Sequence, residues 1–225
     1  MQIQKTVFLF DVDNTLLDHD RVSADLRRHL ESKVGIDQAN KYWRIFETLR
    51  AELGYADYLG ALQRYRLDFP RDPHLLTVSY FLIQYPFANR LFPGSLDAVQ
   101  HVQQWGPSVI LSDGDVVFQP HKISRSGLLE AFDSRVLIYI HKETELSDVE
   151  ARFPASHYVI VDDKLRILTA VKQFWGSRVT TVFVRQGHYA RDPETLSQFP
   201  PADVTLERIG DLATLEFGCG SSGNC

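Results

Sequence analysis

The stretch Thr6-Val-Phe-Leu-Phe-Asp-Val-Asp-Asn-Thr15 joins a short apolar run to two aspartates, Asp11 and Asp13, that are separated by one residue. A continuous apolar run without polar alternation is typical of a strand buried on both faces, as in a parallel sheet covered by helices. Folding alone gives little reason to end such a strand in two carboxylates, because ionised side chains are costly to remove from water. We therefore expect a functional site where this strand ends.

Further apolar runs indicate more strands of the same kind. They lie at Val109–Leu111, Val136–Ile140, Tyr158–Val161 and Val179–Val184. Segments with helical periodicity separate them. Strands that alternate with helices predict an α/β fold with a doubly wound parallel sheet.

The interval between the first two strands breaks this alternation. Val22, Leu26 and Leu30 repeat every four residues there, and no convincing strand follows before Leu91. We interpret residues 20–91 as an inserted α-helical cap domain, and we expect Ser23 to cap its first helix.

The rest of the chain is predicted to form the α/β core, from residues 1–19 and 92–217. Residues 218–225 are rich in Gly and Ser, which indicates a flexible tail, and they contain both cysteines, Cys219 and Cys225. Cysteines placed in this way predict neither a disulfide framework nor a metal-binding motif.

Composition excludes several classes of protein. The 225 residues carry a net charge of −5, so no basic field would attract nucleic acid. No apolar stretch approaches the roughly 18 residues that a membrane span requires. We therefore expect a cytoplasmic protein without a nucleic-acid or membrane partner.

Polar residues follow each apolar run, at the strand ends where ligands bind in open α/β sheets. Besides Asp11 and Asp13, they are Ser112, Asp113, Gly114, His141, Lys142, Asp162 and Asp163. Clustered carboxylates disfavour one another's ionisation, and a divalent cation would reverse that penalty. A set of oxygen ligands without clustered His or Cys favours Mg²⁺, which commonly binds together with a substrate phosphate.

These residues resemble the four motifs of the haloacid dehalogenase-like (HAD) superfamily. DVDNT is similar to its nucleophile motif, LSDGD to its second motif, Lys142 to its lysine and VIVDD to its acidic pair. The four occur in the family's order between Val7 and Asp163, and the helical insertion lies where the family has a helical cap.

The resemblance implies a role for each residue of the first motif. Asp11 would attack phosphorus and form an aspartyl-phosphate. Asp13 would act as general acid and base, and its backbone carbonyl would bind Mg²⁺. Thr15 would orient Asp13 and belong to the phosphate-binding set.

The later motifs would bind the phosphate and balance its charge. The resemblance implies that Ser112 hydrogen-bonds a phosphoryl oxygen, helped by backbone amides near Asp113 and Gly114. Lys142 would balance the charge on the nucleophile and the phosphate.

The metal ligands would be Asp11, Asp13, Asp163 and Asp162. Many relatives carry Gly-Asp instead of this Asp-Asp pair, so either Asp162 or Asp163 could contact the metal directly. His19 is expected to be a surface or structural histidine.

The sequence therefore predicts magnesium-dependent hydrolysis of a small phosphomonoester. Two alternatives stay open: a phosphomutase acting on a sugar phosphate, and a non-catalytic phosphate- or metal-binding protein on the same fold. A dehalogenase is less favoured, because that branch of the superfamily lacks the acid-base aspartate that Asp13 provides here.

Overall fold

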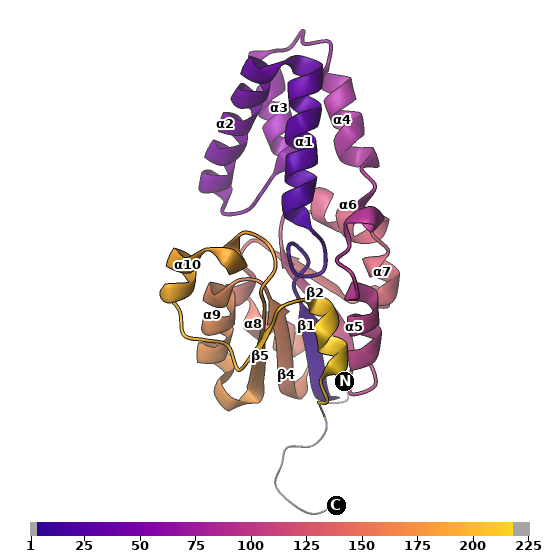
Figure 1. Ribbon diagram of the computed structural model, residues 1–225, viewed down its shortest axis with the longest axis vertical. Coiled ribbons are helices and arrows are strands. Elements are labelled where there is room, and N and C mark those ends of the chain that lie inside the picture. Colours follow the sequence, from indigo (N-terminus) through magenta and orange to yellow (C-terminus); the bar gives the residue numbers. More distant parts are fainter. Residues whose placement is uncertain (1–3, 218–225) are drawn as a thin grey trace, which may run out of the picture.

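A single parallel sheet forms the centre of the computed structural model, which describes residues 4–217. Within that range six strands lie in the order β3-β2-β1-β4-β5-β6, and every neighbouring pair is parallel. The strands are β1 (Gln4–Phe10), β2 (Ser108–Asp113), β3 (Val136–Tyr139), β4 (Ala155–Asp162), β5 (Val179–Val184) and β6 (Val204–Leu206). The predicted α/β class with a doubly wound parallel sheet is confirmed (Figure 1).

Five of these strands coincide with the apolar runs of the sequence, and β6 was not predicted. It has only three residues, Val204-Thr-Leu206, too few to show a periodic pattern. It nevertheless extends the sheet by pairing with β5.

The two faces of the sheet carry separate apolar cores, because successive side chains of a strand point to opposite faces. In β1, Val7 and Leu9 belong to one core, while Phe8 and Phe10 belong to the other. The first core includes α8 (Leu146–Arg152) and α9 (Leu165–Trp175). The second includes α5 (Ser95–Val102), α6 (Phe118–Arg125), α7 (Leu128–Ala131) and the 3₁₀-helix η5 (Ile209–Thr214).

Shorter helical elements connect these layers. They are η1 (Phe87–Arg90), η2 (Lys142–Thr144), η3 (Gly176–Arg178), η4 (Tyr189–Arg191) and α10 (Pro193–Ser197).

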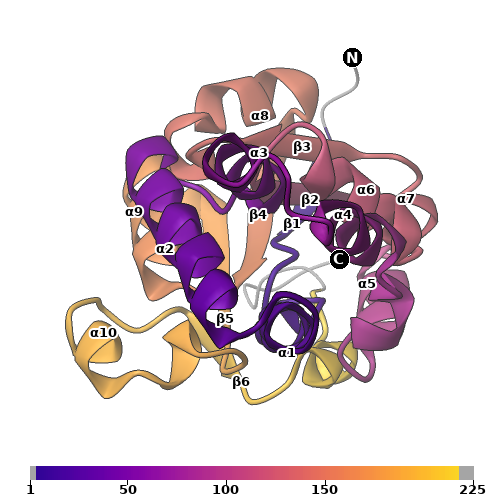
Figure 2. The same ribbon diagram turned by 90° about the horizontal axis from the view of Figure 1, so that it is seen from above.

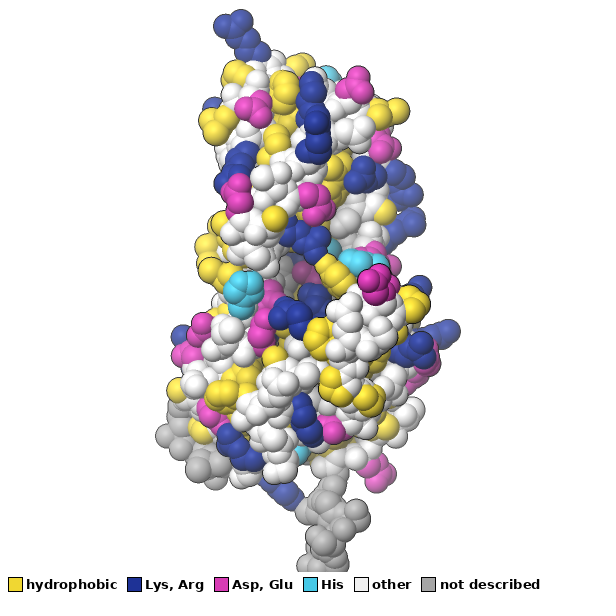
Figure 3. All heavy atoms as spheres, turned by 90° about the vertical axis from the view of Figure 1, so that its left-hand side faces the viewer, with side chains coloured by type: hydrophobic (Ala, Val, Ile, Leu, Met, Phe, Trp, Pro, Cys, Tyr) yellow, Lys and Arg dark blue, Asp and Glu magenta, His cyan; other side chains and the backbone are white. Residues whose placement is uncertain are grey.

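A bundle of helices stands above the edge where the strands end (Figures 1 and 2). We call it the helical bundle; it consists of α1 (His19–Val34), α2 (Ile36–Leu53), α3 (Tyr58–Asp68) and α4 (Leu75–Gln84). The space-filling view shows a hollow between this bundle and the sheet, bordered by Lys, Arg and His side chains and also by Asp and Glu side chains (Figure 3). The division into domains at residues 20 and 91 stays a prediction.

The first helix begins earlier than expected, and Ser23 is not its cap. The carboxylate of Asp18 accepts a hydrogen bond from the backbone N–H of Arg21 at 2.9 Å and caps α1 instead. Ser23 lies inside the helix, where its hydroxyl is 2.8 Å from that of Tyr58 in α3.

The chain enters and leaves the helical bundle side by side. The backbone N–H of Asp18 donates to the carbonyl of Arg90 at 2.7 Å, and that of Phe92 donates to the carbonyl of Leu16 at 2.9 Å. Backbone hydrogen bonds therefore brace the junction between bundle and sheet. Within residues 4–217, no helix is long and apolar enough to cross a membrane. The predicted tail, with Cys219 and Cys225, lies outside the described residues.

Candidate active site

The turn after β1 depends on Asn14, which adopts a left-handed backbone conformation with φ of 63°. Asparagine tolerates this conformation better than most residues. Its side-chain oxygen accepts hydrogen bonds at 3.1 Å from the N–H groups of both His19 and Asp20, at the start of α1. Gly187 packs against this turn so closely that an added Cβ would lie 2.5 Å from Cβ of Asn14. The motif thus joins β1 to α1 through a tightly packed turn.

Asp11 is buried at the end of β1, and both of its carboxylate oxygens have partners. Oδ1 accepts a hydrogen bond from Nζ of Lys142 at 2.6 Å, and Oδ2 accepts one from the hydroxyl of Thr15 at 3.1 Å. Thr15 was expected to orient Asp13. It orients Asp11 instead, because the turn brings the hydroxyl back toward the strand end.

Lys142 lies where it was predicted, with its ammonium between two strand ends. Nζ is 2.7 Å from Oδ2 of Asp162 as well as close to Asp11, and only 1% of the side chain is exposed. Burial alone would lower the pKa of Lys142, but these two carboxylates outweigh it and raise that pKa. The amine is therefore held in its charged form.

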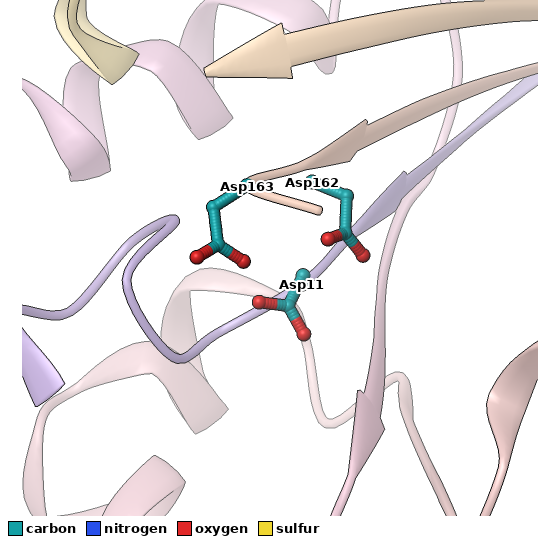
Figure 4. Close-up of side chains that lie close together, drawn as sticks. All are labelled: Asp11, Asp162 and Asp163. Atoms are coloured by element: carbon teal, nitrogen blue, oxygen red, sulfur yellow. The ribbon is translucent and has the colours of Figure 1, made fainter. Parts of the chain in front are cut away.

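Three carboxylates converge at the ends of β1 and β4 (Figure 4). One oxygen from each of Asp11, Asp162 and Asp163 lies within 4.8 Å of the others, and all three residues are buried. Neither carboxylate oxygen of Asp163 has a hydrogen-bond partner among the described residues. Burial raises the pKa of Asp163 well above its usual value, and burial likewise raises the pKa of Asp162 to about 6.

A buried carboxylate without a partner is expensive, so this cluster is suited to a cation. The carboxylates offer oxygen atoms, the kind of ligand that Mg²⁺ prefers. Three of the predicted metal residues thus lie together. The carboxylate of the fourth, Asp13, faces other partners.

Asp13 is bound by two groups from outside its motif. Nζ of Lys122, in α6, lies 2.5 Å from Oδ1 and 2.7 Å from Oδ2 of Asp13. Nδ1 of His19 is 3.3 Å from Oδ1. Burial would raise the pKa of Asp13, but His19 and Lys122 outweigh it and hold that pKa well below its usual value.

The expected phosphate-binding residues lie at the end of β2. Ser112 is buried, and its hydroxyl accepts a hydrogen bond from the amide of Gln119 at 2.8 Å. Asp113 accepts one from the backbone N–H of Lys142 at 2.8 Å. The N–H of Gly114 was expected to face the phosphate, but it donates to the carbonyl of Tyr139 at 3.0 Å. The hydrogen bonding between β2 and β3 therefore continues past the strand end and occupies that amide.

Sequence reasoning missed Lys122 and Gln119, and it treated His19 as structural. A signal for the first two was present. Gln119 and Lys122 lie on the same buried side of α6 as Phe118 and Ile123, where apolar residues would be expected. Polar side chains at such positions indicate a buried polar partner. The position of His19 beside Asp13 depends on the turn and had no comparable signal.

Residues 5–190 match the family model of the haloacid dehalogenase-like hydrolases. The chain belongs to this family. Asp11, Lys142, Asp162 and Asp163 lie together at one edge of the sheet, as expected for residues that follow parallel strands.

Solved structures agree with this assignment. A haloacid dehalogenase-like hydrolase from Burkholderia xenovorans LB400 is 64% identical, with a TM-score of 0.90, over 95% of this chain and 99% of its own. An L-2-haloacid dehalogenase from Xanthobacter autotrophicus with covalently bound chloropropionic acid shares 17% identity and a TM-score of 0.60, over 95% and 98% of the two chains. A magnesium-bound HAD hydrolase from Bacillus subtilis shares 18% identity and a TM-score of 0.58, also over 95% and 98%. The last two show likeness of fold only. Among curated proteins, none matches the chain significantly.

Proposed function

We propose that the chain hydrolyses a small phosphomonoester with the help of Mg²⁺, through an aspartyl-phosphate on Asp11. The observation that carries this proposal is the carboxylate of Asp163, which is buried beside Asp11 with neither oxygen hydrogen-bonded among the described residues. A cation would remove that cost, and Mg²⁺ with one or two carboxylates and a phosphate is a common arrangement. When bound there, Mg²⁺ would neutralise negative charge on the phosphoryl group.

Asp11 would attack phosphorus, and the bond from phosphorus to the leaving oxygen would break. Lys142 and Thr15 hold the carboxylate of Asp11 in place through its two oxygens. Asp13 would give a proton to the leaving oxygen, and it would then take a proton from the water that cleaves the aspartyl-phosphate. The products are an alcohol and inorganic phosphate, and both aspartates return to their starting state.

Asp13 also favours phosphate chemistry over dehalogenation. A halide leaves as an anion without needing a proton, whereas an alkoxide leaving group benefits from a general acid. Asp13 lies two residues after the nucleophile and is placed for that task. Because Lys122 and His19 favour its ionised form, Asp13 must take up a proton before it can act as the acid.

The helical bundle would act as a cap that closes over the substrate and excludes water. Contacts between the helical bundle and residues that follow β5 support this proposal. His188 lies 2.6 Å from Asp20 of α1, and Arg50 of α2 donates a hydrogen bond to the hydroxyl of Tyr189. Lys and Arg side chains border the hollow between the two parts, together with Asp and Glu side chains, and the Lys and Arg charges would attract the phosphate of a substrate (Figure 3).

The test is release of phosphate from p-nitrophenyl phosphate and from a panel of metabolite phosphates, with and without Mg²⁺. We expect Mg²⁺-dependent turnover that Asp11→Asn abolishes. Asp133→Asn is the matched control, because Asp133 is an exposed aspartate whose carboxylate pairs with Arg135. Full turnover by Asp11→Asn would refute the nucleophile assignment.

The same preparation separates the alternatives. Chloride release from L-2-chloropropionate without any phosphate release would replace the proposal with a dehalogenase. Transfer of phosphate between sugar hydroxyls, seen by product analysis, would indicate a phosphomutase. Stabilisation by Mg²⁺ without turnover on any substrate would indicate a binding protein.

A further inference from the structure

We propose that Lys122 is a positioning residue, which holds the carboxylate of Asp13 for proton transfer to the leaving oxygen. This inference rests on the proposed phosphatase function. Lys122 lies in α6 and is distinct from the motif lysine, Lys142, which pairs with Asp11.

The contact between Lys122 and Asp13 is close and symmetric. Nζ lies within 2.7 Å of both carboxylate oxygens, and only 2% of the lysine side chain is exposed, against 25% for Asp13. An exposed lysine has many rotamers and little reason to stay on one partner. A buried ammonium cannot exchange its partner for water, so Lys122 defines where the carboxylate lies.

The helix that carries Lys122 is itself fixed. Phe118 and Ile123 of α6 are buried in the apolar core on one face of the sheet. Gln119 of the same helix donates to Ser112 at 2.8 Å and lies 3.4 Å from Oδ2 of Asp13. One helix thus links the acid-base aspartate to the residue expected to bind the phosphate.

His19 completes the surroundings of Asp13. Its Nδ1 is 3.3 Å from Oδ1 of Asp13 and 3.4 Å from Nζ of Lys122, and its Nε2 is 2.8 Å from the hydroxyl of Tyr58. His19 belongs to the first turn of α1 and Tyr58 to α3, so these two contacts extend into the helical bundle. Lys122, by contrast, belongs to α6, which packs on the sheet and lies outside the helical bundle.

The chemical step needs a fixed carboxyl group. Asp13 carries the proton that it took from the hydrolytic water of the preceding turnover. This proton leaves one oxygen of Asp13 for the ester oxygen as the bond between that oxygen and phosphorus breaks, and Lys122 keeps its hydrogen bond to the other oxygen of Asp13. A misplaced proton donor loses much of its effect on the rate. Loss of Lys122 should therefore slow hydrolysis most for substrates whose leaving group depends most on protonation.

The experiment compares kcat/KM for Lys122→Met and wild type on an alkyl phosphate and on p-nitrophenyl phosphate, with Mg²⁺ present. The value of kcat/KM reports steps up to departure of the leaving group, and p-nitrophenolate leaves without much help. We expect Lys122→Met to lower kcat/KM for the alkyl phosphate by roughly 10- to 100-fold more than kcat/KM for p-nitrophenyl phosphate. This difference is part of the rate enhancement that general acid catalysis supplies. In the Asp13→Asn variant, adding Lys122→Met should not lower kcat/KM further for the alkyl phosphate than for p-nitrophenyl phosphate.

Lys172→Met is the matched control. Lys172 is also a helical lysine paired with an aspartate, Asp203, at 2.7 Å, but it lies in α9 and is half-exposed. We expect it to leave both kcat/KM values unchanged. If Lys122→Met does not fold, as circular dichroism would reveal, Lys122→Gln retains one donor and should give a smaller selective loss.

The outcomes separate the two proposals. Wild type that is inactive on every phosphate ester overturns both. Active wild type, with equal losses on the two substrates or a smaller loss on the alkyl phosphate, overturns the role of Lys122 and leaves the proposed function standing.

Discussion

Nζ of Lys142 lies 2.6 Å from Oδ1 of Asp11, and both side chains are almost completely buried. The same ammonium also pairs with Asp162. One positive charge therefore compensates two carboxylates in a site with little water, and its removal would leave both of them without that partner.

Lys142→Met should accordingly destabilise the fold as well as abolish turnover. Breaking a buried ion pair by removing one partner costs about 3–5 kcal/mol. We expect a loss of that size in the free energy of unfolding, measured by urea denaturation without metal. Lys172→Met, which breaks a half-exposed pair, should cost at most about 1 kcal/mol. Equal costs for the two variants would contradict the importance of burial.

The stability of the metal-free protein should depend on pH through Asp162 and Asp163. An acid with a raised folded-state pKa binds more protons folded than unfolded, so the unfolding free energy falls as pH rises between the two pKa values. For Asp162 this interval runs from 3.8 to about 6, and Asp163 extends it upward. Asp163→Asn should flatten the fall, which thermal melting at a series of pH values would measure. An unchanged slope would argue against a buried carboxylate at Asp163 that lacks a hydrogen-bond partner.

Magnesium should offset the loss of stability that the buried carboxylates cause in the metal-free wild type. A ligand at 100 times its dissociation constant adds about 2.7 kcal/mol of apparent stability. We expect the melting temperature to rise with Mg²⁺ in wild type and to respond much less in Asp163→Asn. A matching rise in both proteins would place the metal elsewhere.

Ser112 offers a test of the phosphate-binding end of β2. Ser112→Ala removes the hydroxyl next to Gln119, and loss of one donor to a transition state costs about 10²–10³ in rate. We expect a fall in kcat of that order with p-nitrophenyl phosphate. Ser108→Ala is the control, because Ser108 is equally buried at the other end of the same strand and receives a hydrogen bond from Gln103. A similar fall in both variants would indicate a structural effect of β2.

Gly187 should be needed for the shape of the turn after β1, which contains Asn14. It has φ of +70°, and a Cβ there would lie 2.5 Å from Asn14, whereas Gly35 has φ of +83° with nothing within 4 Å. Alanine at either position strains the backbone by about 1–3 kcal/mol. Only Gly187→Ala should also reduce turnover, because it displaces the turn. Equal activity in the two variants would show that the turn tolerates the contact.

The sequence was sufficient to predict five of the six described strands of the parallel sheet, because strands buried on both faces are continuous apolar runs, whereas helices repeat their apolar residues every three or four positions. It also predicted the convergence of Asp11, Lys142, Asp162 and Asp163, since parallel strands end at one edge. For these residues, the place directly after a strand was enough to predict their place at the edge of the sheet.

Contacts that depend on the path of a loop or the rotation of a helix could not be predicted in this way. Thr15 hydrogen-bonds Asp11 rather than Asp13 because of the exact course of the turn. Lys122 reaches Asp13 because α6 is rotated so that this lysine faces inward. The register of a turn and the rotation of a helix follow from packing, which no single motif specifies.

The pairing of β1 has a consequence for the order in which the protein folds. Phe8 pairs with Ser108 on one side and with Val159 on the other, so the first strand to be synthesised has distant partners in the chain. The helices α1 to α4 need mainly local contacts and can form before β1 has paired with its neighbouring strands. Until residues 155–162 emerge, β1 presents an apolar segment without its full set of neighbours, the condition in which nascent chains aggregate or recruit chaperones. The strand that leads into Asp11 is thus synthesised early and acquires its neighbours late.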